Sequence, residues 1–190
     1  MAIPIPSRPS GYKLGQADAP ITVEMFFDLE CPFSKRGWNN VMKVANAYSQ
    51  DQIRWVFQLM TLGNHRQSWD ATKAAIAIAE DNTEKFIDVT TRIFAQQAEF
   101  ANEAWKEKTQ TEFHQWLADN IDTSTDKADF LERLNSKDVY AAARIPARFA
   151  TIRGVWSTPT FFINGAEAAD LSSGSSLEAW QAVIDPLLSN

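Results

Sequence analysis

The sequence predicts an α/β fold with a helical insertion. Two β-branched and aromatic segments, Ile21–Phe27 and Ile53–Met60, flank a stretch from Pro32 to about Ser49 whose apolar residues recur every three or four positions. This order is typical of a strand, a helix and a second strand, the pattern of a parallel βαβ unit. From about residue 67 to residue 145 the apolar spacing is helical, and strand signals return only near the C-terminus.

The insertion is predicted as a series of amphipathic, often Ala-rich helices. The four helical stretches are Trp69–Glu80, Thr83–Gln97, Gln110–Asn120 and Lys127–Ala143. Ile145–Pro146 should end the last of them, because proline removes a backbone donor and clashes with the preceding turn. A short separate helix is then expected over Ala147–Ile152, ending at Gly154.

The C-terminal segment predicts two strands and a helix. Thr160–Asn164 is rich in β-branched and aromatic residues, Asn164–Gly165 is a hairpin turn signal, and Ala166–Leu171 is the candidate partner strand. Leu177–Leu188 has helical spacing, and the proline-containing Met1–Ser10 is expected to be extended. The predicted organisation is a first α/β part over residues 11–64, a helical insertion over 65–145 and a second part over 146–190.

Composition narrows the function classes. The 190 residues carry 18 Lys+Arg and 24 Asp+Glu, a net charge of −6, whereas nucleic-acid-binding surfaces are normally basic. The single cysteine excludes an intramolecular disulfide, a Cys-based zinc site and an iron–sulfur cluster. We therefore expect neither nucleic acid nor a metal ion as a partner.

The N-terminus and the length of the apolar runs bear on the cellular compartment of the protein. No apolar run approaches the roughly 18 residues that a membrane span needs, so no membrane association is expected. Three prolines in the first nine residues do not fit the apolar core of a signal peptide. The expectation is a cytoplasmic protein, and a mature chain whose leader has been removed stays open as the alternative.

The lone thiol begins the segment Cys31-Pro32-Phe33-Ser34, between the first strand and the first helix. The unpaired N–H groups and the positive end of the dipole at a helix N-terminus favour a thiolate, and Pro32 at the first helical position loses no hydrogen bond. Ser34 lies on the same helical face, so its hydroxyl could donate to the thiolate. Free cysteines are often buried and inert, and position alone leaves both interpretations open.

Two segments carry a family resemblance. Ile21-Thr-Val-Glu-Met-Phe-Phe-Asp-Leu-Glu-Cys-Pro-Phe-Ser34 resembles the start of DsbA-type thioredoxin-fold proteins, in which a strand ending in Phe-x-Asp-x-x precedes Cys-Pro-x-Cys. Gly154-Val-Trp-Ser-Thr-Pro-Thr-Phe-Phe-Ile-Asn-Gly165 is similar to a second signature of that family, Gly-Val-x-Gly-Thr-Pro-Thr-Phe-Phe-Ile-Asn-Gly. The resemblance covers roughly residues 12–188 and implies a DsbA-like thioredoxin fold with a helical insertion.

The resemblance implies roles for individual residues. Cys31 would be the nucleophile that forms a mixed disulfide, and Ser34 would accompany it in the catalytic motif. Thr158, before a cis Pro159, would present its backbone to an extended substrate or to glutathione, as in strand addition. The remaining expected substrate-binding residues flank the thiol in sequence: Pro32, Phe33 and Trp156.

The sequence departs from the family at two positions. The family's second, resolving cysteine is Ser34 here, so a mixed disulfide at Cys31 would need an external thiol for its release. The family's buried glutamate, six residues before the nucleophile, is Met25. Glu24 cannot simply replace it, because successive strand side chains point to opposite faces. Loss of both groups favours a natural one-cysteine protein over an engineered substitution.

Other aromatic and histidine residues have less specific patterns. Trp38 and Trp156 could line a groove beside the thiol, with core packing as the alternative, and Phe33 is expected to be exposed. His65 is expected to cap the insertion rather than to join the site. His114 lies on a polar helical stretch with no evident partner.

Three functions are compatible with these features. The favoured one is a monothiol thiol–disulfide oxidoreductase in which Cys31 forms mixed disulfides with glutathione or protein substrates. A redox-inactive binding module with a thioredoxin fold, and a glutathione transferase or isomerase similar to the kappa class, are the alternatives. No bound cofactor is expected, glutathione is a candidate co-substrate, and the oligomeric state stays open.

Overall fold

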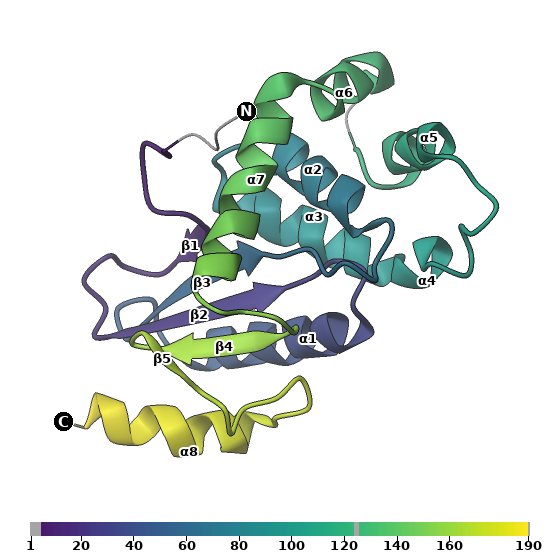
Figure 1. Cartoon of the computed structure of the whole chain (residues 1–190). Coiled ribbons are helices and arrows are strands. Elements are labelled where there is room, and N and C mark those ends of the chain that lie inside the picture. Colours follow the sequence, from purple (N-terminus) through teal and green to yellow (C-terminus); the bar gives the residue numbers. More distant parts are fainter. Residues whose placement is uncertain (1–4, 124–125, 190) are drawn as a thin grey trace.

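The computed structural model describes residues 5–123 and 126–189 and contains a five-stranded sheet flanked by helices (Figure 1). The strand order across the sheet is β1-β3-β2-β4-β5. β2 and β3 are parallel, as the predicted βαβ unit requires, and the other neighbouring pairs are antiparallel. The strands are β1 (Tyr12–Leu14), β2 (Ile21–Phe27), β3 (Ile53–Leu59), β4 (Thr160–Ile163) and β5 (Ala166–Glu167).

The predicted insertion, residues 65–145, is a group of helices that follows β3, and Figure 1 shows it beside the sheet. Side-chain caps define several helix starts: Asn82 accepts from the Lys85 N–H, and Thr109 and Glu112 form a capping box. The helices are α1 (Pro32–Ala47), α2 (Ser68–Ala79), α3 (Thr83–Ala95), α4 (Gln97–Phe100), α5 (Gln110–Asn120), α6 (Lys127–Leu134), α7 (Lys137–Ile152) and α8 (Leu177–Leu188).

Aromatic packing joins helices to both faces of the sheet. On one face, Trp38 of α1 lies 5.3 Å from Phe27 of β2 between ring centroids, and Trp180 of α8 lies 5.8 Å from Trp55 of β3. Helix α3 contributes further rings to this main core. α7 covers part of the opposite face, where a smaller cluster surrounds the fully buried Phe26. Successive side chains of β2 point to opposite faces of the sheet, and they pack against helices on both faces.

Helix α7 corrects one expectation. It runs without interruption through Pro146, where the sequence predicts a break, so Ala147–Ile152 is the last part of α7 and not a separate helix. A proline removes one backbone donor, but packing on both sides of it can hold the helix together. Ala143 before the proline and Ala150 after it are both fully buried. The prediction of a helix end at Ile145–Pro146 is wrong for this tertiary reason.

Shorter elements also differ from the prediction. The unpredicted β1 has three residues between Gly11 and Gly15, which is too short for a recognisable period. β5 has two residues instead of Ala166–Leu171, because a turn closed by the Leu171 N–H and the Ala168 carbonyl follows it. Of the expected extended segment Met1–Ser10, residues 1–4 lie outside the described residues, and residues 5–10 form neither helix nor strand.

The predicted helix Lys127–Ala143 is divided between α6 and α7. Ser136 ends the continuity, since its hydroxyl accepts from the Val139 N–H and starts a new helix. Within residues 5–123 and 126–189, no helix has the length and apolar character needed to cross a lipid bilayer. The same described residues contain no group of three His, Cys, Asp or Glu side chains placed to hold a metal ion.

Candidate functional site

The thiol lies at the junction of β2 and α1. Cys31 is the N-cap residue of α1, with Pro32 at the start of the helix, and it is 3% exposed. Its Sγ donates to the carbonyl oxygen of Thr158 at 3.4 Å. The Thr158–Pro159 peptide bond is cis. Residues separated by 127 positions in the sequence therefore meet at the thiol, as the two family-like segments predict.

Close backbone packing surrounds this meeting point. A Cβ atom added to Gly37 of α1 would lie 3.0 Å from Cγ of Pro159 and 3.4 Å from Cε of Met25. Glycine at this position therefore allows α1 to approach the proline loop. Met25 is fully buried on this face, while Glu24 points to the other face and pairs with Arg153 at 3.1 Å. Glu24 is therefore not a substitute for a carboxylate under the thiol.

Ser34 has a different contact from the one expected. Its side chain is fully buried, and its Oγ accepts from the Asp28 N–H at 3.2 Å. The hydrogen bonds of the described residues include none between Ser34 Oγ and Cys31 Sγ. The first turn of α1 places the hydroxyl beneath the loop that follows β2, so Ser34 stabilises that loop rather than contacting the sulfur.

A buried carboxylate organises the same loop. Asp28 is fully buried and accepts from the Leu62 N–H at 2.6 Å and the Glu30 N–H at 2.8 Å. Its Oδ2 also lies 3.1 Å from Nδ1 of His65. His65 is thus tied to the loop that leads to Cys31, where sequence analysis expects only a cap of the insertion. Asp28 lies within the family-like Phe-x-Asp pattern, which was the available signal for this position.

Two further groups hold the residues on either side of the thiol. Glu30 is 4% exposed and accepts from the Gln67 N–H at 2.8 Å. Burial raises the pKa of Glu30, and the backbone hydrogen bond from Gln67 and the nearby His65 oppose that rise only in part. From the insertion, the Gln97 amide donates to the carbonyls of Leu29 at 2.9 Å and Cys31 at 3.0 Å.

The aromatic residues near the thiol divide into exposed and buried ones. Phe33, two residues from Cys31, is 60% exposed. Trp156, two residues from Thr158, whose carbonyl contacts the sulfur, is 83% exposed. Trp38 is 1% exposed and its Nε1 donates to Thr91, so it belongs to the core and not to a groove. Exposed aromatic side chains beside a thiol offer apolar contact area to a docking partner.

A second buried polar cluster lies within the insertion. Asp70 is paired with Nζ of Lys73 at 2.8 Å and Nε2 of His114 at 3.1 Å, and it accepts from Gln110 at 2.8 Å. Burial alone would raise the pKa of Asp70, but these hydrogen bonds outweigh it and lower the pKa to about 2. The expectation that His114 has no partner is wrong, because α5 packs against α2 in the folded chain.

The fold and the site define a class of protein. The parallel βαβ unit, the thiol at the N-terminus of α1, the facing Thr158–Pro159 loop and the helical insertion together make a DsbA-like thioredoxin fold with one cysteine. Residues 7–186 match the family model described as thioredoxin. The chain therefore belongs to the thioredoxin family.

Solved structures share the fold at low sequence identity. A Pseudomonas syringae structure with a provisional protein-disulfide isomerase assignment has a TM-score of 0.80 at 20% identity, over 92% of this chain and 97% of that one. BdbD from Bacillus subtilis gives 0.73 at 18% identity, over 95% and 94%. Wolbachia pipientis alpha-DsbA1 gives 0.73 at 18% identity, over 98% and 94%. At these identities the likeness concerns the fold.

Curated relatives are much longer proteins. A Na(+)/H(+) antiporter NhaA 1 from Mycobacterium sp. (strain KMS) is 28% identical over 152 residues, which cover 80% of this chain and 23% of the relative. The protein of the same name from Mycolicibacterium gilvum (strain PYR-GCK) is 27% identical over 173 residues, covering 84% and 26%. The chain spans about a quarter of the length of these curated relatives.

Proposed function

We propose that the protein is a monothiol thiol–disulfide oxidoreductase, in which Cys31 forms mixed disulfides that an external thiol resolves. The observation that carries this proposal is the position of Cys31 Sγ, 3.4 Å from the Thr158 carbonyl at the N-terminus of α1, with serine at position 34. Cys31 is the N-cap residue of α1 and therefore lies at the positive end of the helix dipole. Serine cannot complete an internal disulfide.

The proposed reaction has two exchange steps. In the first, the Cys31 thiolate attacks a sulfur of a glutathionylated protein or a disulfide. A new S–S bond forms at Cys31, the old S–S bond breaks, and the displaced thiolate takes a proton from solvent. In the second, a glutathione thiolate attacks the mixed disulfide, forms a disulfide with the bound group and returns the Cys31 thiolate. Glutathione is thus a co-substrate and not a bound cofactor.

The residues around the sulfur suggest how a substrate would be held. Thr158, whose carbonyl contacts the sulfur, and the cis Pro159 that follows it would face an extended chain. Pro32, Phe33 and Trp156 are exposed and would contact its side chains. Backbone pairing with an extended peptide supplies affinity without strict sequence selection. The same arrangement suits glutathione, which is itself a short peptide.

Burial of the thiol supports a second candidate function. Cys31 is 3% exposed, whereas Phe33 and Trp156 beside it are largely exposed. A redox-inactive binding module would use these aromatic side chains and would not need the sulfur. Capture of partners by the wild-type protein and by Cys31→Ala compares the two functions, since equal capture by both would favour the binding module.

Intact-mass analysis after incubation with oxidised glutathione tests the covalent mechanism. The wild type should gain one glutathionyl group, release one glutathione and lose the adduct on addition of reduced glutathione. Cys31→Ser should gain nothing. Ser34→Cys should lose the adduct without added thiol, because the second cysteine can form an internal disulfide. A folded wild type that gains no adduct would contradict the proposal.

A further inference from the structure

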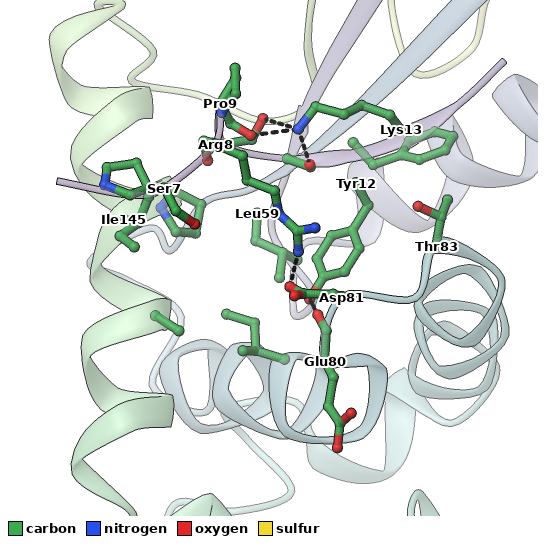
Figure 2. Close-up of a pocket in the computed structure, with 17 residues that line it drawn as sticks. Ser7, Arg8, Pro9, Tyr12, Lys13, Leu59, Glu80, Asp81, Thr83 and Ile145 are labelled. Atoms are coloured by element: carbon green, nitrogen blue, oxygen red, sulfur yellow. Dashed lines mark hydrogen bonds and ion pairs between the residues drawn. The ribbon is translucent and has the colours of Figure 1, made fainter. Parts of the chain in front are cut away.

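Two cavities lie along α7, on either side of the segment that precedes β1. The first, about 330 Å³, is shown in Figure 2. Arg8 pairs with Asp81 across it, and the Tyr12 hydroxyl donates to the Glu80 carbonyl at 2.9 Å. These polar groups are therefore matched by protein partners. The second cavity differs in this respect.

The second cavity, about 460 Å³, lies between α7 and the sheet face that α7 covers only in part. Its walls are largely apolar and include Val56 of β3 and Ile145, Phe149 and Ile152 of α7. Cavities of roughly 300–1,000 Å³ with apolar walls and a few polar groups are typical of small-molecule sites. Ile152, which is 71% exposed, stands at the rim.

The charged groups of this cavity are mostly cationic. Lys13, Arg54 and Arg148 line it together with one carboxylate, Glu24. Glu24 is already paired with Arg153 at 3.1 Å. The chain as a whole carries a net charge of −6, so this concentration of positive charge is a local feature. It complements an anion and not a cation or a neutral molecule.

Arg54 lines the cavity with a guanidinium group whose hydrogen-bonding capacity is only partly used. Its Nη1 donates to the Ala17 carbonyl at 3.3 Å. Its Nε is buried, and among the described residues it donates to no acceptor. Nε and Nη2 form the side of a guanidinium that binds both oxygens of a carboxylate. A buried donor without an acceptor is unfavourable, so Arg54 gains a hydrogen bond if its side chain turns to present this edge to a carboxylate in the cavity.

The other two cations add charge in different ways. The Lys13 ammonium donates to the carbonyls of Pro9, Ser10 and Gly11, which uses its three donors, so it contributes charge and not a hydrogen bond to a ligand. Burial lowers the pKa of Lys13, and Arg54 and Arg8 lower it further, so the positive charges here are close enough to repel one another. Arg148 is exposed and forms no ion pair with any other described residue. It can therefore turn toward a ligand at the rim.

We infer that this cavity binds an amphipathic monocarboxylate, such as a medium-chain fatty acid. The carboxylate pairs with the Arg54 guanidinium, and Lys13 and Arg148 add positive charge around it. The hydrocarbon part lies between Val56 and the apolar side of α7. The inference is independent of thiol chemistry, because the cavity is lined by none of the residues that contact Cys31 Sγ.

Displacement of a fluorescent anion tests this site in the full chain. The probe is 8-anilinonaphthalene-1-sulfonate, whose fluorescence rises in apolar surroundings, and the competitor is decanoate below its micelle concentration. We expect saturable binding of about one probe per chain, displaced by decanoate and much less by decanol. Equal displacement by decanol would overturn the role of the carboxylate. Cys31→Ser should bind as the wild type does.

Paired variants locate the site. Ile152→Asp places a negative charge at the rim and should weaken decanoate binding about tenfold or more. Leu187→Asp adds the same charge at an exposed apolar position of α8, on the other side of the sheet, and should have little effect. Equal weakening by both would indicate a general charge effect and overturn the assignment.

Arginine variants test the cationic contacts. Arg148→Gln should weaken decanoate binding several-fold, while Arg144→Gln, one turn earlier on α7, should not, since Arg144 does not line the cavity. Arg54→Met should weaken binding about tenfold and reduce the preference for decanoate over decanol. If Arg54→Met does not fold, the two exposed positions, Ile152 and Arg148, still decide the outcome. Unchanged binding in both of those variants would overturn the inference.

Discussion

Two buried carboxylates, Glu30 beside the thiol and Asp70 in the insertion, have pKa values shifted in opposite directions. Their residues are similarly buried, at 4% and 6% exposure. Asp70 has a lysine, a histidine and a glutamine as partners, and its pKa falls to about 2. Among the described residues, Glu30 accepts only from backbone groups, those of Gln67 and Asn102, and burial raises its pKa. Burial raises the pKa of both carboxylates; at Asp70 the surrounding donors outweigh it, whereas at Glu30 they do not, and the nearby Asp28 raises the pKa further.

The largest effect on the free energy of unfolding is expected when the Asp70 carboxylate, which has several polar partners, is removed. Asp70→Asn leaves the buried Lys73 ammonium without its anion and should lower the free energy of unfolding by about 3 kcal/mol at pH 7. Urea denaturation measures the change. Asp88→Asn, which breaks an exposed pair with Arg92 in the same insertion, is the control and should change stability by less than about 1 kcal/mol. Similar losses in both variants would contradict the comparison.

Acid should remove the Asp70 contribution in a defined range. Because the folded-state pKa of Asp70 is lowered from 3.8 to about 2, its contribution is present above pH 3.8 and is lost as pH falls through 2. The wild type should lose about 2 kcal/mol between pH 4 and pH 2 that Asp70→Asn does not lose. Denaturation curves across this range, with Asp88→Asn as the reference, measure the difference. Parallel curves for all three proteins would refute the assignment.

The smallest effect on stability is expected at Glu30, where replacement of the carboxylate should stabilise the protein instead of destabilising it. A raised folded-state pKa means that the stabilising contribution is present below the unfolded value of 4.5 and is lost as pH rises through the folded value. Glu30→Gln keeps an acceptor for the Gln67 N–H and removes the buried charge. It should be neutral near pH 4 and stabilising by up to about 1 kcal/mol at pH 8. If Glu30→Gln instead becomes more destabilised as pH rises, the donors around Glu30 compensate the charge of its carboxylate.

The local signals in the sequence were sufficient for most of the fold. The β-branched and aromatic composition of Ile21–Phe27, the helical spacing from Pro32 and the Asn164–Gly165 turn are properties of neighbouring residues, and the corresponding elements are present. The meeting of Cys31 with Thr158 followed from the family-like segments and not from spacing. The helix through Pro146 was missed because the packing that maintains it comes from other elements.

The polar partners were harder to predict than the elements. Asp28 and His65 are 37 positions apart, and Asp70 and His114 are 44 apart, so neither pair shares a local pattern. Each pair forms when separate elements pack together. The spacing of residues along a single sequence does not show which elements will lie close in space. Ser34 shows the same limit at short range, because the loop above it and not the helix spacing determines its contact.

The Gln97 side chain links the helical insertion to the loop that carries the thiol. One amide from the insertion holds the two carbonyls that bracket the thiol loop, those of Leu29 and Cys31. An excised thioredoxin core without the insertion would leave both oxygens without this donor, next to the Cys31 sulfur. The insertion is therefore part of the framework of the thiol loop and not a detachable addition. A shortened chain should lose the ordered geometry at Cys31 before it loses the sheet.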